Sequence, residues 1–187
     1  MWGRALVVTA LVAAGASPVL AHQGEDLRAA LAAAFPEGSD IERRTAFLAE
    51  EERASVARLS STDAGDVPGV ITYYVARSDS GPPSFAYFDV HVVRTHREVL
   101  LFLVDAEGTL RRAEVVRFAE PPEYLPPDAW LKRFSGLEDL DRISTKRDIP
   151  PLTGATLTAR AATAAARRVL AIHRLVVAPE WAERPGT

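Results

Sequence analysis

The segment FAYFDVHVVRTHREVLLFLVD, residues 85–105, decides the fold. It contains two runs rich in Val, Leu and Phe, Phe85–Arg94 and Glu98–Asp105, separated by only the three residues 95–97. A link this short cannot return the chain for a parallel strand, which needs a crossover of about a dozen residues or more. The two runs therefore predict an antiparallel hairpin at the centre of a β-sheet.

Two further runs of the same kind flank this hairpin, Val70–Arg77 before it and Leu110–Phe118 after it. The links on both sides are short and rich in turn residues, and Asp105 and Gly108 are placed for a tight hairpin turn. The pattern predicts an antiparallel sheet of about four strands.

Helical patterns lie at both ends of the chain. The sequence predicts helices over Asp26–Phe35, over Ile41–Leu59 after an N-cap signal at residues 39–40, and over Leu157–Val177, with Pro179 ending the last one. The predicted fold class is α+β, a single domain in which N-terminal helices and a long C-terminal helix flank the sheet.

Between the last strand and the long helix, Glu120–Asp128 is too rich in proline for a regular helix. Asp128 then caps a short helical segment that Gly136 ends. Trp130 and Phe134 lie four residues apart on one face of this segment, which predicts that both belong to the core.

The composition excludes several classes of function. The chain has 187 residues, no cysteine and a net charge of −3. It therefore has no disulfide, no thiolate nucleophile and no cysteine metal site. Nor does it show the basic surface that nucleic-acid binding requires.

The first residues indicate export. Arg4 precedes an apolar run of the length of a signal-peptide core, and Val19 and Ala21 occupy the small-residue positions before a cleavage point. An uncleaved anchor helix is the weaker alternative, because the run is short for a bilayer and Pro18 interrupts it. We expect cleavage after Ala21 and a mature protein in the periplasm or another extracytoplasmic space.

The predicted organisation is a signal peptide over residues 1–21, a helical segment over 22–66 and the main domain over 67–178. The last part contains TGATLT, residues 153–158, directly before the long helix. Thr153 is expected to cap this helix, with Gly154, Ala155 and Thr156 in its first turn.

The unpaired N–H groups of a first helical turn suit a phosphate. No lysine follows Gly154 as in a P-loop, and the glycines of a dinucleotide fingerprint are missing. On local physics alone, a simple helix cap stays an equally good interpretation of the stretch.

Thr153-Gly154-Ala155-Thr156 followed by Leu157 and Thr158 resembles the flavinylation motif of the FMN-binding domain family, as does the preceding segment from Trp130 to Gly136. That family includes small extracytoplasmic subunits of the Rnf and sodium-pumping NADH:quinone reductase complexes, NosR-type flavin domains and stand-alone exported proteins. The resemblance covers roughly residues 68–175. Many members carry an acidic residue six positions before the acceptor threonine, where this chain has Pro150 and the nearest acid is Asp148.

The resemblance implies that Thr156 carries FMN through a phosphoester bond, with the other five residues of TGATLT around it. It implies an ApbE-type flavin transferase as a partner, and a membrane or periplasmic redox partner that can include peripheral contact with a membrane complex. The expected function is extracytoplasmic electron transfer rather than catalysis on a small-molecule substrate of the protein's own. Glu120 and Tyr124 are the candidates for the seat of the flavin ring, and packing of Tyr124 on the sheet edge is the alternative.

Two other classes of function stay open. Cleavage would make His22 the N-terminal residue, and with further histidines it could chelate copper; the others are His91, His96 and His173. The second class is a non-redox sensory or assembly module of the same fold. The acids Asp89, Asp105, Glu114 and Glu120 form no convincing catalytic pair and are interpreted as solvated or turn residues.

Overall fold

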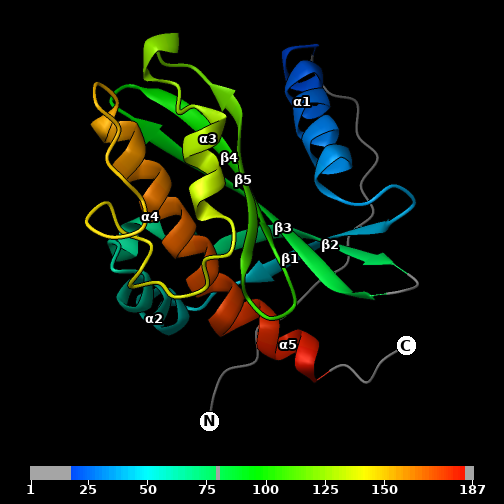
Figure 1. Ribbon diagram of the computed structural model, residues 1–187. Helices are drawn as coiled ribbons and strands as arrows, with labels where there is room; N and C mark the ends of the chain where they lie inside the picture. Colours follow the sequence, from blue (N-terminus) through cyan, green and yellow to red (C-terminus); the bar gives the residue numbers. More distant parts are fainter. Residues whose placement is uncertain (1–17, 79–80, 184–187) are drawn as a thin grey trace.

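Five antiparallel strands form one sheet in the strict order β1-β2-β3-β4-β5, as the computed structural model shows (Figure 1). The structure describes residues 18–78 and 81–183. The strands are β1 (Asp40–Phe47), β2 (Val70–Ser78), β3 (Gly81–Val93), β4 (His96–Val104) and β5 (Leu110–Phe118). The α+β class and all four predicted strands are confirmed, and β1 adds a fifth.

The predicted helix over Ile41–Leu59 is wrong. Its first part is β1, which pairs with β2 from Asp40 to Phe47, and its second part is α2 (Glu50–Ser60). Ala46 is buried, Phe47 is 46 % exposed and Leu48 is buried, so the burial alternates with the period of a strand. Segment 22–66 therefore contributes a strand to the common sheet and is not purely helical.

Helices cover both faces of the sheet (Figure 1). Helix α1 (Pro18–Ala34) packs on one face through Ala30 and Leu31, together with Phe35 directly after it. The larger core lies on the other face, beneath α2, α3 (Asp128–Leu131) and α4 (Thr156–Ile172). The remaining elements are short: the 3₁₀ helices η1 (Ala64–Asp66), η2 (Pro122–Tyr124) and η3 (Lys132–Phe134), the π-helical turn η4 (His173–Val177), and α5 (Ala178–Ala182).

The first helix begins earlier than predicted. It starts at Pro18 and continues through Ala21, the expected cleavage position. The rest of the predicted signal peptide lies outside the described residues. None of the helices in the described part of the chain is both long and apolar enough to cross a membrane.

The C-terminal helix extends beyond its predicted end at Pro179. After α4, the π-helical turn η4 leads directly into α5, which ends at Ala182. Pro179 is the second residue of α5, directly after the π-helical turn, and the helix continues past it. Trp181 then packs its ring edge-on against Phe85, with 5.6 Å between centroids.

The short helical segment before α4 anchors the approach to it. Trp130 and Phe134 are both buried, as predicted, and their rings meet edge-on with centroids 5.3 Å apart. The Trp130 Nε1–H donates a hydrogen bond to the carbonyl of Pro150 at 2.7 Å. The N-cap position belongs to Pro127 and not, as predicted, to Asp128, which is the first helical residue.

Candidate functional site

The stretch TGATLT forms the entrance to α4, with a geometry that differs from the prediction. The helix begins at Thr156, and its N-cap residue is Ala155, so the prediction that Thr153 caps it is wrong. Thr153 and Gly154 belong to a preceding turn, closed by a hydrogen bond from the Ala155 N–H to the Leu152 carbonyl at 3.2 Å. Gly154 has a φ of +83°, a conformation that L side chains rarely adopt.

The three hydroxyls of this stretch lie in different environments. Thr156 is exposed at the first helical position, and its Oγ1–H donates to the Leu152 carbonyl at 3.3 Å. Thr158 is only 1 % exposed, and Thr153 is exposed but outside the helix. Thr156 is therefore the one threonine of the three that combines an accessible hydroxyl with a place on the helix end.

The first turn of α4 offers N–H groups to an anion. The first residue after the N-cap whose N–H reaches a protein acceptor is Ala159, which bonds to the Ala155 carbonyl at 3.0 Å. In the described part of the chain, the N–H groups of Thr156, Leu157 and Thr158 have no such acceptor. The turn contains no acidic residue, so no carboxylate in it neutralises the positive end of the helix dipole.

The segment directly after β5, which contains the candidates for the flavin ring seat, lies at the same end of the molecule as the start of α4 (Figure 1). Helix α4 runs antiparallel to β3, because Arg168 contacts Asp89 and the later His173 contacts the earlier Tyr87. The start of α4 therefore points toward the β3–β4 turn. Tyr124 packs on that turn, where the Arg94 guanidinium lies 3.9 Å from its ring centroid. One face of the ring is thus already covered.

Glu120 is buried against the β3–β4 turn. Its Oε1 accepts hydrogen bonds from the N–H groups of Thr95 at 3.3 Å and His96 at 3.2 Å. Burial alone would raise the pKa of Glu120, but these hydrogen bonds and the His96 side chain lower it. The carboxylate therefore holds the turn, which leaves it less free to contact a cofactor.

The motif is not part of the best-defined cavities of the described residues. Three of these cavities are lined by other parts of the chain and include no residue of 153–158. Leu157 is 47 % exposed beside Thr156. A ring tethered at Thr156 would lie on an open surface.

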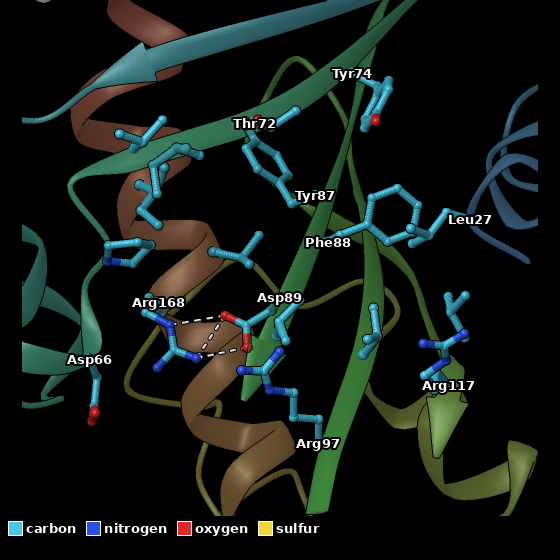
Figure 2. Close-up of a pocket in the computed structure, with 18 of the residues that line it drawn as sticks. Leu27, Asp66, Thr72, Tyr74, Tyr87, Phe88, Asp89, Arg97, Arg117 and Arg168 are labelled. Carbon is cyan, nitrogen blue, oxygen red and sulfur yellow. Dashed lines mark hydrogen bonds and ion pairs between the residues drawn. The ribbon is translucent and has the colours of Figure 1, made fainter. Parts of the chain in front are cut away.

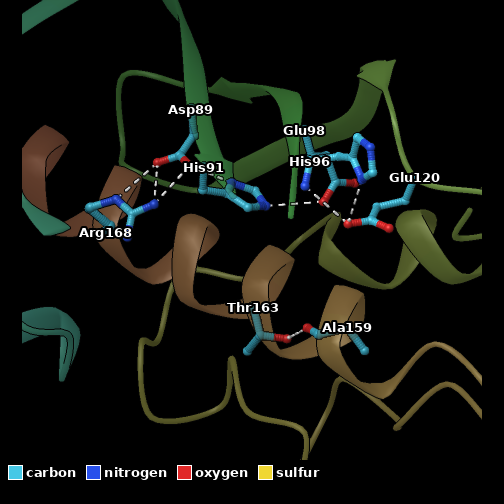
Figure 3. Close-up of polar contacts among 8 residues, drawn as sticks. All are labelled: Asp89, His91, His96, Glu98, Glu120, Ala159, Thr163 and Arg168. Atoms are coloured by element: carbon cyan, nitrogen blue, oxygen red, sulfur yellow. Dashed lines mark hydrogen bonds and ion pairs between the residues drawn. The ribbon is translucent and has the colours of Figure 1, made fainter. Parts of the chain in front are cut away.

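A buried ion pair joins the middle of α4 to β3 (Figure 3). The Arg168 guanidinium binds both carboxylate oxygens of Asp89: Nε donates to Oδ2 at 2.9 Å, and Nη2 to Oδ1 at 2.8 Å and to Oδ2 at 2.7 Å. Both side chains are more than 90 % buried. Burial alone would raise the pKa of Asp89, but the hydrogen bond from His91 and the Arg168 charge lower it below its usual value.

His91 extends this pair into a chain of charges. Its Nδ1–H donates to Asp89 Oδ1 at 2.8 Å, and its Nε2–H donates to Glu98 Oε2 at 3.1 Å. Burial would lower the pKa of His91, but the two carboxylates raise it to about 9, so the ring is an imidazolium at neutral pH. Glu98 is fully buried, and its Oε1 has no hydrogen-bond partner among the described residues.

Sequence reasoning missed this network, and the prediction that the acids are solvated or turn residues is wrong for Asp89 and Glu120. The signal was present, since Asp89 and His91 continue the inward-facing alternation of Phe85 and Tyr87. The other two acids fit the prediction better. Asp105 closes the β4–β5 hairpin turn through Thr109 N–H at 2.8 Å, and the half-buried Glu114 pairs with Arg112.

The histidine side chains that the structure describes form no metal-binding group. Among the described residues, no group of three His, Cys, Asp or Glu side chains could hold a metal ion. His173 is buried and bonded to the Tyr87 hydroxyl at 2.8 Å, and burial lowers its pKa to about 4. The side chain of His22, on which the copper alternative depends, lies outside what the structure describes.

Comparison with known proteins adds no assignment. No family model matches the chain, and no curated protein matches it with significant similarity. The resemblance of TGATLT to a flavinylation motif therefore rests on the motif, its upstream segment and the position that the fold gives it.

Proposed function

We propose that this protein carries FMN, esterified through its phosphate to the Thr156 hydroxyl, and transfers electrons between redox partners outside the cytoplasm. The observation that carries the proposal is the accessible Thr156 hydroxyl at the first position of a 17-residue helix with unpaired N–H groups. When bound, the flavin would supply the redox chemistry. The protein supplies the attachment point and the electrostatic setting.

The residues at the helix start fit the phosphate end of FMN. Three N–H groups and the helix dipole favour an anion there. A Cβ built on Gly154 would meet no atom within 4 Å, so the approach to the backbone is open. Arg160, one turn later, is exposed and has no ion-pair partner among the described residues.

The open surface around Thr156 suits a tethered cofactor. At an exposed attachment point, affinity alone would hold FMN only at free concentrations near its dissociation constant. A covalent bond removes that dependence and leaves an edge of the ring accessible to a partner. Electron transfer between proteins is therefore favoured over turnover of a small substrate, for which an enclosed pocket is the usual arrangement.

The experiment is co-production of the chain with an ApbE-type flavin transferase, followed by denaturing electrophoresis under ultraviolet light. We expect a fluorescent band for the unaltered chain and none for Thr156→Val. The matched control is Thr153→Val, three residues earlier and also exposed, which keeps the fluorescence. A fluorescent Thr156→Val band, or a dark band for the unaltered chain with active transferase present, contradicts the proposal.

A further inference from the structure

Strands β2 and β3 separate part-way along the sheet. Their pairing ends at Tyr73 and Tyr87, whereas β1 continues beside β2 as far as Val70 and β4 continues beside β3 as far as Val93. The sheet therefore divides into two pairs of strands at this point. We call the space between β2 and β3 beyond Tyr73 the fork.

The fork contains a cavity of about 670 Å³ (Figure 2). Because the sheet is open here, residues from both of its faces reach the cavity, including Arg168 and Ile172 of α4 on one side and Leu27 of α1 on the other. A volume in this range is typical of small-molecule sites. The fork is thus large enough for a ligand of moderate size.

Apolar side chains form most of its walls. They include Val70, Tyr74, Phe88, Val90, Val99 and Val116. Val70 is 54 % exposed and Val90 is 57 % exposed, so an aliphatic side chain stands open to solvent on each strand of the fork. Exposed apolar residues that gather around a cavity indicate a surface that a partner or ligand covers.

Arginines surround these apolar walls. The strand register places Arg97 opposite Val92 and Arg117 opposite Val99, on the α1 face of the sheet. Arg117 pairs with Asp26 of α1, with 3.4 Å between Nη2 and Oδ2. Arg97, which is exposed, has no ion-pair partner in the described part of the chain.

Arg43, on β1, is the second arginine of the cavity for which residues 18–78 and 81–183 provide no ion-pair partner. Asp89 in the floor is neutralised by Arg168 and Asp26 by Arg117, so Asp66 is the remaining acid of the lining against the two arginines. The charge available to a ligand is therefore positive.

We propose that the fork binds an amphipathic carboxylate, a molecule with an apolar body and one acidic head group. The apolar walls would take the body, and the guanidinium of Arg97 would take the head. A cation would meet unpaired arginines, and a neutral apolar molecule would leave them without a partner.

This site is separate from the flavin site. Arg168 lies twelve residues after Thr156, which at 1.5 Å per residue places it roughly 18 Å along α4. Arg97 lies nearer the β3–β4 turn, but on the α1 face of the sheet, whereas α4 packs on the opposite face. The inference does not depend on the proposed function, and it can be tested on chain produced without a flavin transferase. Failure of one proposal leaves the other intact.

The test is isothermal titration calorimetry with three ligands of equal chain length: decanoate, decanol and decyltrimethylammonium. We expect saturable binding of decanoate, with each of the other two bound at least tenfold more weakly. Arg97→Gln should weaken decanoate binding about tenfold, the scale of one lost charge-assisted contact. Val90→Glu should abolish it, because the substitution adds a negative charge to an exposed apolar wall.

The matched control is Arg133→Gln, an exposed arginine on η3 outside the lining of the fork, which should leave the affinity unchanged. Circular dichroism of every variant checks that the fold is intact. Absence of decanoate binding, equal binding of the three ligands, or undiminished binding by folded Arg97→Gln and Val90→Glu overturns the proposal.

Discussion

The two parts of helix α4 show opposite ways of handling polar groups. At its start, three N–H groups have no protein acceptors among the described residues, and the exposed Thr156 hydroxyl has one, the Leu152 carbonyl at 3.3 Å. Three turns later, Nε and Nη2 of Arg168 donate hydrogen bonds to the Asp89 carboxylate, and both side chains are buried. One end of the helix is open to an added group, whereas its middle is closed by the protein's own charges.

The contrast separates attachment from stability. A site that presents unpaired groups to solvent contributes little to folding, so its residues are free to serve a ligand. A buried ion pair matters to the free energy of unfolding in a different way. If one partner is removed, the charge of the other stays buried without compensation. Substitutions in the two regions should therefore differ sharply in their effects on stability.

The largest effect is expected for Arg168→Leu. It leaves the Asp89 carboxylate buried without its main partner, which costs about 3–5 kcal/mol of unfolding free energy. Urea denaturation monitored by circular dichroism measures this loss. The double variant Asp89→Leu/Arg168→Leu should recover part of it, because no lone charge stays buried. A double variant that is no more stable than Arg168→Leu would show that the pair does not act as a unit.

The next effect concerns pH. His91 has a pKa of about 9 in the folded protein, above the ordinary value of 6.5. The folded state therefore binds more protons between these values, and the stabilisation is complete below pH 6.5 and lost as the pH rises through 9. The loss is on the order of 3 kcal/mol. Denaturation midpoints between pH 6.5 and 10 measure it.

His91→Gln is the control for this pH dependence. It removes the titrating ring, so its stability should fall much less over the same alkaline range than that of the unaltered chain. Equal slopes for the two proteins would mean that His91 is not the group responsible.

A smaller effect is expected at the entrance to α4. Gly154→Ala forces a Cβ into a conformation with φ of +83°, at a cost of about 1 kcal/mol, although the surrounding space is empty. Gly65→Ala is the matched comparison, because that glycine also has open space around it but no positive φ. The difference between the thermal unfolding midpoints of the two variants measures the cost of the positive φ. Equal midpoints would contradict this prediction.

Sequence patterns predicted the sheet well where strands follow one another through short turns. They failed at β1, where charged residues such as Glu42 and Arg44 resemble a helix surface and only pairing with β2 reveals a strand. The candidate attachment site was visible because a motif is contiguous. Strand alternation indicates that Asp89 and His91 face inward, but it does not indicate their contact with Arg168, which lies 79 residues after Asp89 and meets it only through tertiary packing.

The same reasoning explains the helix ends. The prediction placed the start of α4 a few residues too early. Thr153 has the side chain of a cap, but it belongs to the turn at Gly154 that precedes the helix. The end was misplaced because a π-helical turn lets the helix continue past a proline. Both errors arise from backbone geometry that residue preferences do not determine.

The most direct test of the attachment site is the intact mass of the chain after co-production with a flavin transferase, followed by mass analysis of the peptide that contains residues 153–158. The account predicts an added mass of one FMN less one water, located on Thr156 and lost in Thr156→Val, whose stability stays within about 0.5 kcal/mol of the unaltered chain. An unmodified mass, or an adduct on another residue, would contradict it.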